Sequence, residues 1–161
     1  MNSKRNHTDA SALSITEKLV TEGEGLRLKP YMDTTAKITI GYGRNIDEEG
    51  ISWEEAKMLM ANDIVRSYNE LLAEFSFFKE LSEFRKSVIA DMHYNLGLSR
   101  LLSFKKMLRA IQLGNFDMAA DELLDSTYAQ QVGDRARRNY YMMKFNQFCT
   151  KEQGKSYFVN Q

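Results

Sequence analysis

The sequence contains a single cysteine, Cys149, and a single proline, Pro30, among its 161 residues. One cysteine excludes an intrachain disulfide, so folding does not depend on an oxidising compartment, and we expect Cys149 to serve packing. Proline breaks helices, and its near absence together with a hydrophobic content of 43% favours a folded, largely helical chain over a disordered one. A chain of this length buries about 70% of its unfolded surface, which is enough for one domain with a core.

Histidine is almost as rare, and this limits the chemistry that the chain can carry out. His7 and His93 lie far apart, and neither has cysteines or carboxylates at the spacing of a metal site. We therefore expect no metal and no cofactor. No Ser–His or Cys–His pairing stands out from chance, which disfavours acyl transfer. Residues 41–43, Gly-Tyr-Gly, lack the third glycine of a dinucleotide loop and indicate a strand end that requires small residues.

The chain also lacks a net charge and a long apolar run. Residues 1–83 carry 10 basic and 15 acidic side chains, whereas residues 84–161 carry 12 and 7. The basic second half suits either an anionic polymer or an ordinary solvated surface. No segment approaches the roughly 18 apolar residues of a membrane span, and the polar first ten residues lack the apolar run of a secretory signal. We therefore expect a cytoplasmic protein without stable membrane association.

A basic cluster, Arg-Ala-Arg-Arg, occupies residues 135–138. It lacks the aromatic stacking platform that single-stranded nucleic-acid binders use. A helix that starts near Asp134 explains the cluster equally well, so we expect no nucleic-acid partner.

The pattern along the chain predicts an α+β fold with a mostly helical lobe and a small lobe. Residues 1–12 are expected to form a flexible arm, and residues 13–161 a single domain whose small lobe covers about residues 23–52. In that lobe, residues 28–32 and 38–42 predict a short antiparallel hairpin. A small lobe hinged on a helical lobe would form a cleft for a polymeric substrate.

Capping boxes and apolar periodicity predict the helices. Residues 14–17, Ser-Ile-Thr-Glu, should start a helix that ends near Gly23, and residues 52–55, Ser-Trp-Glu-Glu, should start a long one whose apolar side includes Ile51. Further helical patterns run over residues 82–96, 104–113, 115–124 and 134–148.

Two carboxylates and a threonine stand at a suggestive spacing around the hairpin. Glu24 lies between two glycines at a predicted helix end, Asp33 begins the turn nine residues later, and Thr39 follows six residues further on the returning strand. Cutting a glycosidic bond takes an acid for the leaving oxygen, a base for the attacking water and a hydroxyl that holds this water. A water-exposed glutamate and an aspartate folded onto turn amides remain the alternative interpretations.

Residues 24–33, Glu-Gly-Leu-Arg-Leu-Lys-Pro-Tyr-Met-Asp, and residues 39–43, Thr-Ile-Gly-Tyr-Gly, resemble the active-site segment of the phage-type lysozyme family of endolysins. The catalytic Glu, Asp and Thr of that family fall at the same two separations. The resemblance continues at residues 94–97, 107–108, 115–120 and 135–138, so it covers nearly the whole chain after the arm. It implies a lysozyme-like fold and hydrolysis of the β-1,4 bond between N-acetylmuramic acid and N-acetylglucosamine in peptidoglycan.

The resemblance also implies roles for single residues. Glu24 is the general acid, Asp33 orients and activates the water, and Thr39 helps to hold it. In the family, an arginine that matches Arg135 pairs with the acid. Sugar binding is assigned to Asn45, Tyr94 and Phe104. For an inverting mechanism the two carboxyl groups should stand about 6.5 to 9.5 Å apart, which leaves room for the water.

In biological terms, the resemblance implies a cofactor-free monomer that lyses the host at the end of infection. It would stay in the host cytoplasm until a separate membrane-permeabilising protein lets it reach the wall. Two alternatives remain open. A lytic transglycosylase cleaves the same bond but closes an internal anhydro ring, and a non-catalytic wall-binding protein could use the same fold.

The sequence departs from the family pattern in three places. The stretch over residues 43–52 is much shorter, which predicts a reduced small lobe. Arg44 replaces a histidine, so a histidine-centred salt bridge is lost. Gly23 replaces an acidic residue, which leaves Arg138 without its expected partner.

Overall fold

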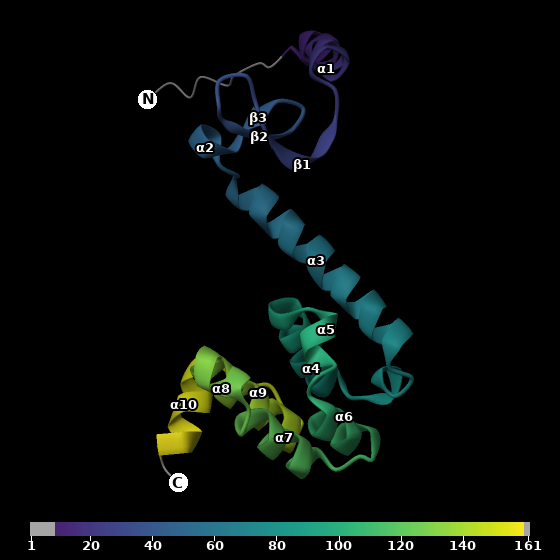
Figure 1. Ribbon diagram of the computed structural model, residues 1–161, viewed down its shortest axis with the longest axis vertical. Helices are drawn as coiled ribbons and strands as arrows, with labels where there is room; N and C mark the ends of the chain where they lie inside the picture. Colours follow the sequence, from purple (N-terminus) through teal and green to yellow (C-terminus); the bar gives the residue numbers. More distant parts are fainter. Residues whose placement is uncertain (1–8, 160–161) are drawn as a thin grey trace. The chain divides into compact units, whose positions relative to one another are not determined.

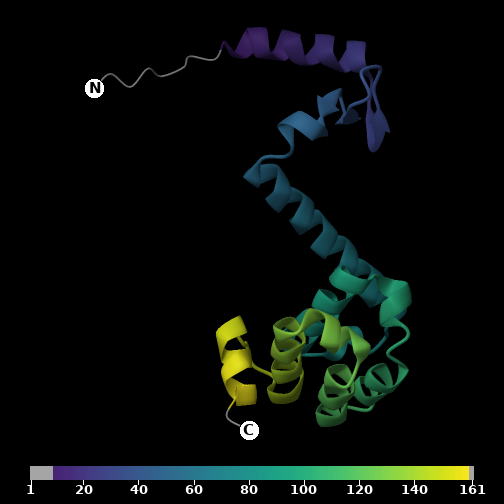
Figure 2. The same cartoon turned by 60° about the vertical axis from the view of Figure 1, so that its left-hand side comes forward.

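The computed structural model of the protein describes residues 9–159 (Figure 1, Figure 2). Helices make up most of these residues and accompany one small antiparallel sheet, which confirms the predicted α+β class. The chain divides into two compact units, Met1–Lys57 and Met58–Gln161. Residues 1–8 of the predicted arm lie outside the described residues, and residues 10–12 belong to the first helix.

The first helix, α1 (Ala10–Glu24), begins earlier than predicted. The Asp9 carboxylate caps it by accepting hydrogen bonds from the backbone N–H groups of Ser11, at 3.1 Å, and Ala12, at 3.3 Å. The predicted capping box at residues 14–17 is therefore wrong, because these residues lie inside the helix. The helix ends at Glu24, one residue beyond the predicted end.

The predicted hairpin is confirmed by strands β1 (Arg27–Met32) and β2 (Ile38–Gly41). They pair antiparallel, with Met32 opposite Ile38 and Tyr31 opposite Thr39. A two-residue strand, β3 (Arg44–Asn45), adds to the other side of β2, so the sheet order is β1-β2-β3. Pro30 lies on the edge strand β1, where a residue without an N–H group is tolerated, and the register shifts between Arg27 and Tyr31.

A tight turn over residues 33–37 joins β1 to β2. The Asp33 N–H donates to the Lys37 carbonyl at 2.9 Å, and the Ala36 N–H donates to the Asp33 carbonyl at 3.1 Å. Ala36 takes a left-handed conformation with φ +61°, which costs a residue with a Cβ more than it costs glycine. The turn that begins at Asp33 therefore contains local strain at Ala36.

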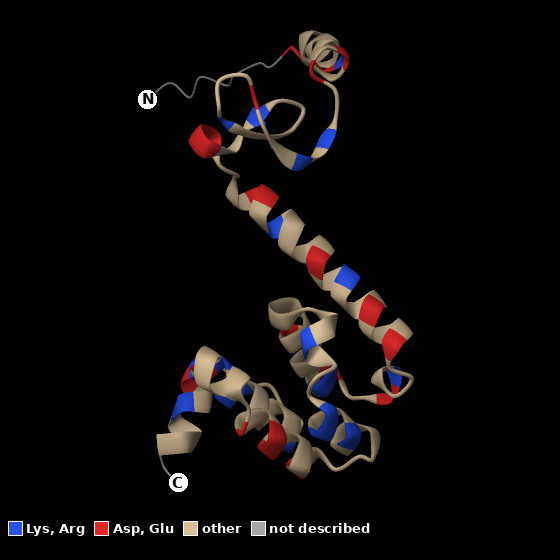
Figure 3. Ribbon diagram, viewed as in Figure 1, with Lys and Arg blue, Asp and Glu red and all other residues tan. Residues whose placement is uncertain are grey.

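A short helix, α2 (Ile46–Glu49), follows β3 and was not predicted. Its first turn is acidic, as the red ribbon of Figure 3 shows, and acidic groups are favourable at a helix N-terminus. The Asn45 side chain caps this helix by accepting the Glu48 N–H at 3.2 Å. Polar contacts therefore hold α2 next to β3.

The predicted capping box at residues 52–55 is confirmed at the start of α3 (Trp53–Glu74). The Ser52 hydroxyl accepts the Glu55 N–H at 3.1 Å, and Glu55 accepts the Ser52 N–H at 2.7 Å. Arg44 donates to the Gly50 carbonyl at 2.8 Å and to Glu55 at 2.6 Å, which ties β3 to the start of α3. Ile51 precedes α3, so its predicted place on the helix is wrong.

The unit Met58–Gln161 contains the greater part of α3 and a set of shorter helices around one core. The shorter helices are η1 (Phe78–Glu80), α4 (Glu83–Leu96), α5 (Leu98–Leu101), α6 (Lys105–Gln112), α7 (Phe116–Leu124), α8 (Thr127–Val132), α9 (Asp134–Phe145) and α10 (Lys151–Val159). The four predicted helices correspond to α4, α6, α7 and α9, whereas η1, α5, α8 and α10 were missed. Helix α9 ends before residue 148 because Asn146 takes a left-handed conformation with φ +54°.

The core of this unit is built from aliphatic, aromatic and sulfur-containing side chains. Those with no measurable exposure include Leu71, Phe78, Val88, Ile89, Met92, Leu101, Leu123, Met143 and Cys149. The expected packing role of Cys149 is therefore confirmed. Over residues 9–159, no helix combines the length and the apolar character that crossing a membrane requires.

The strained turn gives a stability prediction. Replacing Ala36 by Gly should raise the free energy of unfolding by about 1 kcal/mol, because glycine takes φ +61° without a Cβ penalty. Urea unfolding followed by circular dichroism measures the change. The matched control, Ala61→Gly inside α3, should have the opposite sign, since glycine lowers helix stability by about 1 kcal/mol. A loss of stability in Ala36→Gly would contradict the assignment of strain.

Candidate active site

Glu24 is the last residue of α1 and lies against the turn between β2 and β3. A Cβ added at Gly43 would stand 2.7 Å from the Glu24 Oε2 atom and 2.9 Å from its Cδ atom. Gly43 has φ +76°, and Gly25, which follows Glu24, has φ +66°. The prediction that residues 41–43 require small residues is therefore confirmed at Gly43, because the carboxylate fills the space of a side chain.

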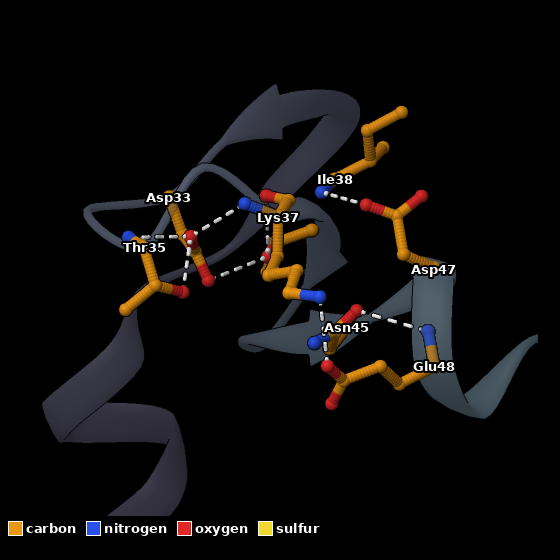
Figure 4. Close-up of polar contacts among 8 residues, drawn as sticks. Asp33, Thr35, Lys37, Ile38, Asn45, Asp47 and Glu48 are labelled. Atoms are coloured by element: carbon orange, nitrogen blue, oxygen red, sulfur yellow. Dashed lines mark hydrogen bonds and ion pairs between the residues drawn. The ribbon is translucent and has the colours of Figure 1, made fainter.

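The Asp33 carboxylate is bound very unequally through its two oxygens (Figure 4). Oδ1 accepts hydrogen bonds from the Thr35 N–H at 2.8 Å, from the Thr35 hydroxyl at 2.9 Å and from the Lys37 N–H at 2.9 Å. Within the described part of the chain, Oδ2 has one donor, the Thr39 hydroxyl, at the longer distance of 3.4 Å. Oδ2 is therefore the oxygen with room for a further partner.

These donors also set the charge of Asp33. The Lys37 N–H holds the pKa of the carboxyl below its ordinary value, Thr35 and Thr39 add to this, and partial desolvation opposes it. Because the unfolded chain takes up this proton first, the hydrogen bonds stabilise the fold at neutral pH, and this contribution is lost as the pH falls through the lowered pKa. Asp33 is thus an ionised carboxylate at neutral and mildly acidic pH.

Thr39 is placed on β2 between Tyr31 of β1 and Asn45 of β3. Only 3% of its surface is exposed, and its hydroxyl lies 3.4 Å from Asp33 Oδ2 and 3.3 Å from the Lys37 carbonyl. The predicted approach of Thr39 to Asp33 is confirmed, and so is the alternative in which Asp33 binds turn amides. The two interpretations describe different oxygens of the same carboxylate.

The three residues assigned to sugar binding lie in different surroundings. Asn45 uses its side-chain oxygen to cap α2. In the unit Met58–Gln161, Tyr94 lines a cavity of about 350 Å³ together with Arg135. Phe104 lines another of about 400 Å³, and its ring meets Tyr128 edge to face at 6.0 Å. Their sugar-binding roles stay predictions.

Arg135 makes a two-pronged ion pair with Asp91, a residue that the sequence analysis missed. Its Nε atom lies 2.9 Å from Oδ2 and its Nη2 atom 2.8 Å from Oδ1, and these hydrogen bonds hold the pKa of Arg135 above its ordinary value. The buried Asn139 amide donates to the same carboxylate at 2.7 Å, and Arg138 approaches it to 3.4 Å. Arg138 thus has a partner, although not the one expected from the family. The pairing of Arg135 with Glu24 stays a prediction.

One signal in the sequence could have identified Asp91. It is the sole acidic residue between Glu83 and Asp117, and it lies in the middle of α4 among apolar side chains. A carboxylate in such a place usually has a cationic partner. Over residues 9–159, no group of three or more His, Cys, Asp or Glu side chains could hold a metal ion.

The residues of the site lie in a segment that is similar to a known protein family. A family model described as phage lysozyme matches residues 21–140, a segment that contains Glu24, Asp33, Thr39 and Arg135. The chain belongs to the phage lysozyme family. As a member of this family, the protein is a glycosidase of the muramidase type.

Individual relatives agree with the family. Two proteins of Dictyostelium discoideum, "Probable T4-type lysozyme 1" and "Probable T4-type lysozyme 2", are each 28% identical over 144 residues, covering 71% of this chain and 85% of their own. The "Pre-baseplate central spike protein Gp5" of Enterobacteria phage T4 is 24% identical over 159 residues. That alignment covers 81% of this chain but 28% of the spike protein.

The contact between Glu24 and Gly43 gives a test of the site. Gly43→Ala should lower wall-degrading activity by about 10- to 100-fold, because the added Cβ must displace the Glu24 carboxylate by about 1 Å. Gly41→Ala is the matched control: Gly41 also has a positive φ, of +70°, but no atom lies within 4 Å of an added Cβ. Clearing of a peptidoglycan suspension measures both variants. Equal losses would mean that backbone strain, and not the position of Glu24, decides the effect.

Proposed function

We propose that this phage lysozyme hydrolyses the β-1,4 bond between N-acetylmuramic acid and N-acetylglucosamine in bacterial peptidoglycan, with inversion at the sugar carbon. Glu24 is the general acid, and Asp33 together with Thr39 activates the water. The observation that carries the proposal is the unequal binding of Asp33: Oδ1 accepts from three donors, whereas Oδ2 has, within residues 9–159, only the Thr39 hydroxyl at 3.4 Å and keeps the capacity to accept a further hydrogen bond, from a water.

In this mechanism Glu24 donates its proton to the glycosidic oxygen as the bond from that oxygen to the sugar carbon breaks. A water on the opposite face of the sugar attacks the carbon, and Asp33 Oδ2 accepts a proton from this water. Asp33 ends protonated and Glu24 ionised, and exchange with solvent restores both groups. The hydrogen bonds that keep Asp33 ionised before reaction support its assignment as the base.

The Thr39 hydroxyl has a single hydrogen and can donate it to Asp33 Oδ2 while its lone pairs accept a hydrogen bond from water. A water bound to both groups would have its direction fixed by two contacts. This supports an attacking water rather than direct attack by Asp33, for which the carboxylate would have to approach the sugar carbon closely. The expected separation of the Glu24 and Asp33 carboxyl groups is about 6.5 to 9.5 Å.

The biological role that we propose is supported by family membership alone. The protein would act as a monomer on the wall of an infected host, without nucleic acid or a stable hold on the membrane. It would accumulate in the host cytoplasm and reach the wall after a separate protein has permeabilised the membrane. A lytic transglycosylase is less consistent with the site, because that reaction needs an acid but no pair that activates water.

The role of Glu24 has a direct test. Glu24→Gln should lower the rate of wall hydrolysis by about 10² to 10⁴-fold, because an amide cannot donate a proton as a carboxylic acid does. Glu22→Gln, at an exposed glutamate two residues earlier in α1, is the matched control and should keep its activity. Circular dichroism should show both variants folded. Substantial activity in folded Glu24→Gln would refute the assignment.

Product analysis distinguishes the reaction from its alternatives. Peptidoglycan digested in ¹⁸O-labelled water and examined by mass spectrometry should yield reducing muramic ends that contain one solvent oxygen. Anhydro-muramic ends would identify a transglycosylase instead. Undigested wall that still retains the protein would identify a non-catalytic binder.

A further inference from the structure

Thr35 makes two of the three hydrogen bonds that occupy Asp33 Oδ1 (Figure 4). Its backbone N–H donates at 2.8 Å and its hydroxyl at 2.9 Å. The residue is exposed and lies in the turn, where a side chain free in solvent would be ordinary. The Thr35 hydroxyl instead donates to a carboxylate oxygen of Asp33, so it can influence how Asp33 binds water.

We propose that Thr35 is a positioning residue for Asp33, and that its hydroxyl closes Oδ1 to water and so directs the attacking water to Oδ2. The inference rests on the proposed function, in which Asp33 is the base. The effect of Thr35 passes through Asp33, because its hydroxyl contacts the oxygen that does not face Thr39.

The geometry explains why a third donor matters. The torsion that rotates an aspartate carboxylate is soft, so the two oxygens exchange places easily unless contacts hold them. Three donors on Oδ1 oppose that rotation, and together they fill the directions from which a water could approach this oxygen. With the hydroxyl removed, two donors remain and a water could bind Oδ1 instead of Oδ2.

The Lys37 donor is held independently of the Thr35 side chain, and the other remaining donor is the backbone N–H of residue 35, which the substitution keeps. The Lys37 ammonium group pairs with Glu48 at 2.9 Å, and the next N–H along the chain, that of Ile38, donates to Asp47 at 2.8 Å. Both partners belong to α2, as Figure 4 shows. The Lys37 N–H should therefore stay in place when the Thr35 side chain changes, which makes removal of the hydroxyl a clean test.

Removal of the hydroxyl has two opposing effects on the rate. Loss of a donor raises the pKa of Asp33 and makes it a stronger base. The rate constant rises by only a fraction of this increase in base strength, because the Brønsted exponent is below one. Displacement of the attacking water by about 1 Å costs up to about 100-fold. The displacement of the water should therefore outweigh the stronger base, and the rate should fall.

The experiment compares three variants of the full chain. Thr35→Val removes the hydroxyl at constant shape and should lower kcat about tenfold with little change in KM, while the acid limb of the pH–rate profile moves to higher pH. Thr35→Ser restores a hydroxyl and should recover most of the rate and the original profile. Thr34→Val makes the same substitution at the neighbouring exposed threonine and should match the unmodified protein.

A second measurement does not need activity. The carboxyl carbon of Asp33, followed by NMR during a pH titration, should titrate at higher pH in Thr35→Val than in Thr34→Val or Thr35→Ser. An unchanged titration, or a Thr35→Val enzyme with unchanged kcat and pH profile, overturns the inference while the proposed function stands. An unmodified protein that releases no reducing ends overturns the proposed function, and the titration then still decides whether the Thr35 hydroxyl holds Asp33.

Discussion

The hydrogen bonds that converge on Asp33 Oδ1 are the interaction on which the sheet of the unit Met1–Lys57 depends. They close the turn over residues 33–37, and the same turn fixes where β2 begins and which of its residues oppose β1. They also keep Asp33 charged, because N–H and O–H donors favour the ionised carboxylate. One set of contacts therefore serves hairpin formation, strand register and the ionisation state of Asp33.

A second constraint is the absence of a side chain at Gly43. Glu24 ends a helix, and its carboxylate can lie against the β2–β3 turn because nothing larger than hydrogen stands there. The short α2 then holds the other side of the hairpin through Asp47 and Glu48. In this way a lobe of few residues, too small for a hydrophobic core of its own, is ordered by glycines and polar contacts rather than by apolar burial.

The unit Met58–Gln161 is organised differently, around an apolar core. The partly buried carboxylate of Asp91 lies on α4, one of the helices that form this core. Asp91 collects Arg135, Arg138 and the buried amide of Asn139. A carboxylate in the middle of α4 would be costly without such partners, and with them it fixes the direction of the Arg135 side chain. The family role expected of Arg135 must therefore operate from a side chain that already has an anionic partner.

The sequence alone determined what depends on neighbouring residues. It predicted the hairpin from β-type segments around a polar turn, the capping box at Ser52, and the spacing of Glu24, Asp33 and Thr39, because turns, caps and strand alternation are local. It misplaced the start of α1, because both Asp9 and Ser14 are residues that can cap a helix, and the sequence does not show which of them does. It missed α2, because a helix of four residues is too short to show a helical repeat of apolar residues. Only the tertiary structure decided which Asp33 oxygen is open, that Glu24 lies over Gly43, and that Asp91 holds Arg135. These depend on side-chain rotation and on contacts between residues as far apart as 44 positions, which periodicity does not encode.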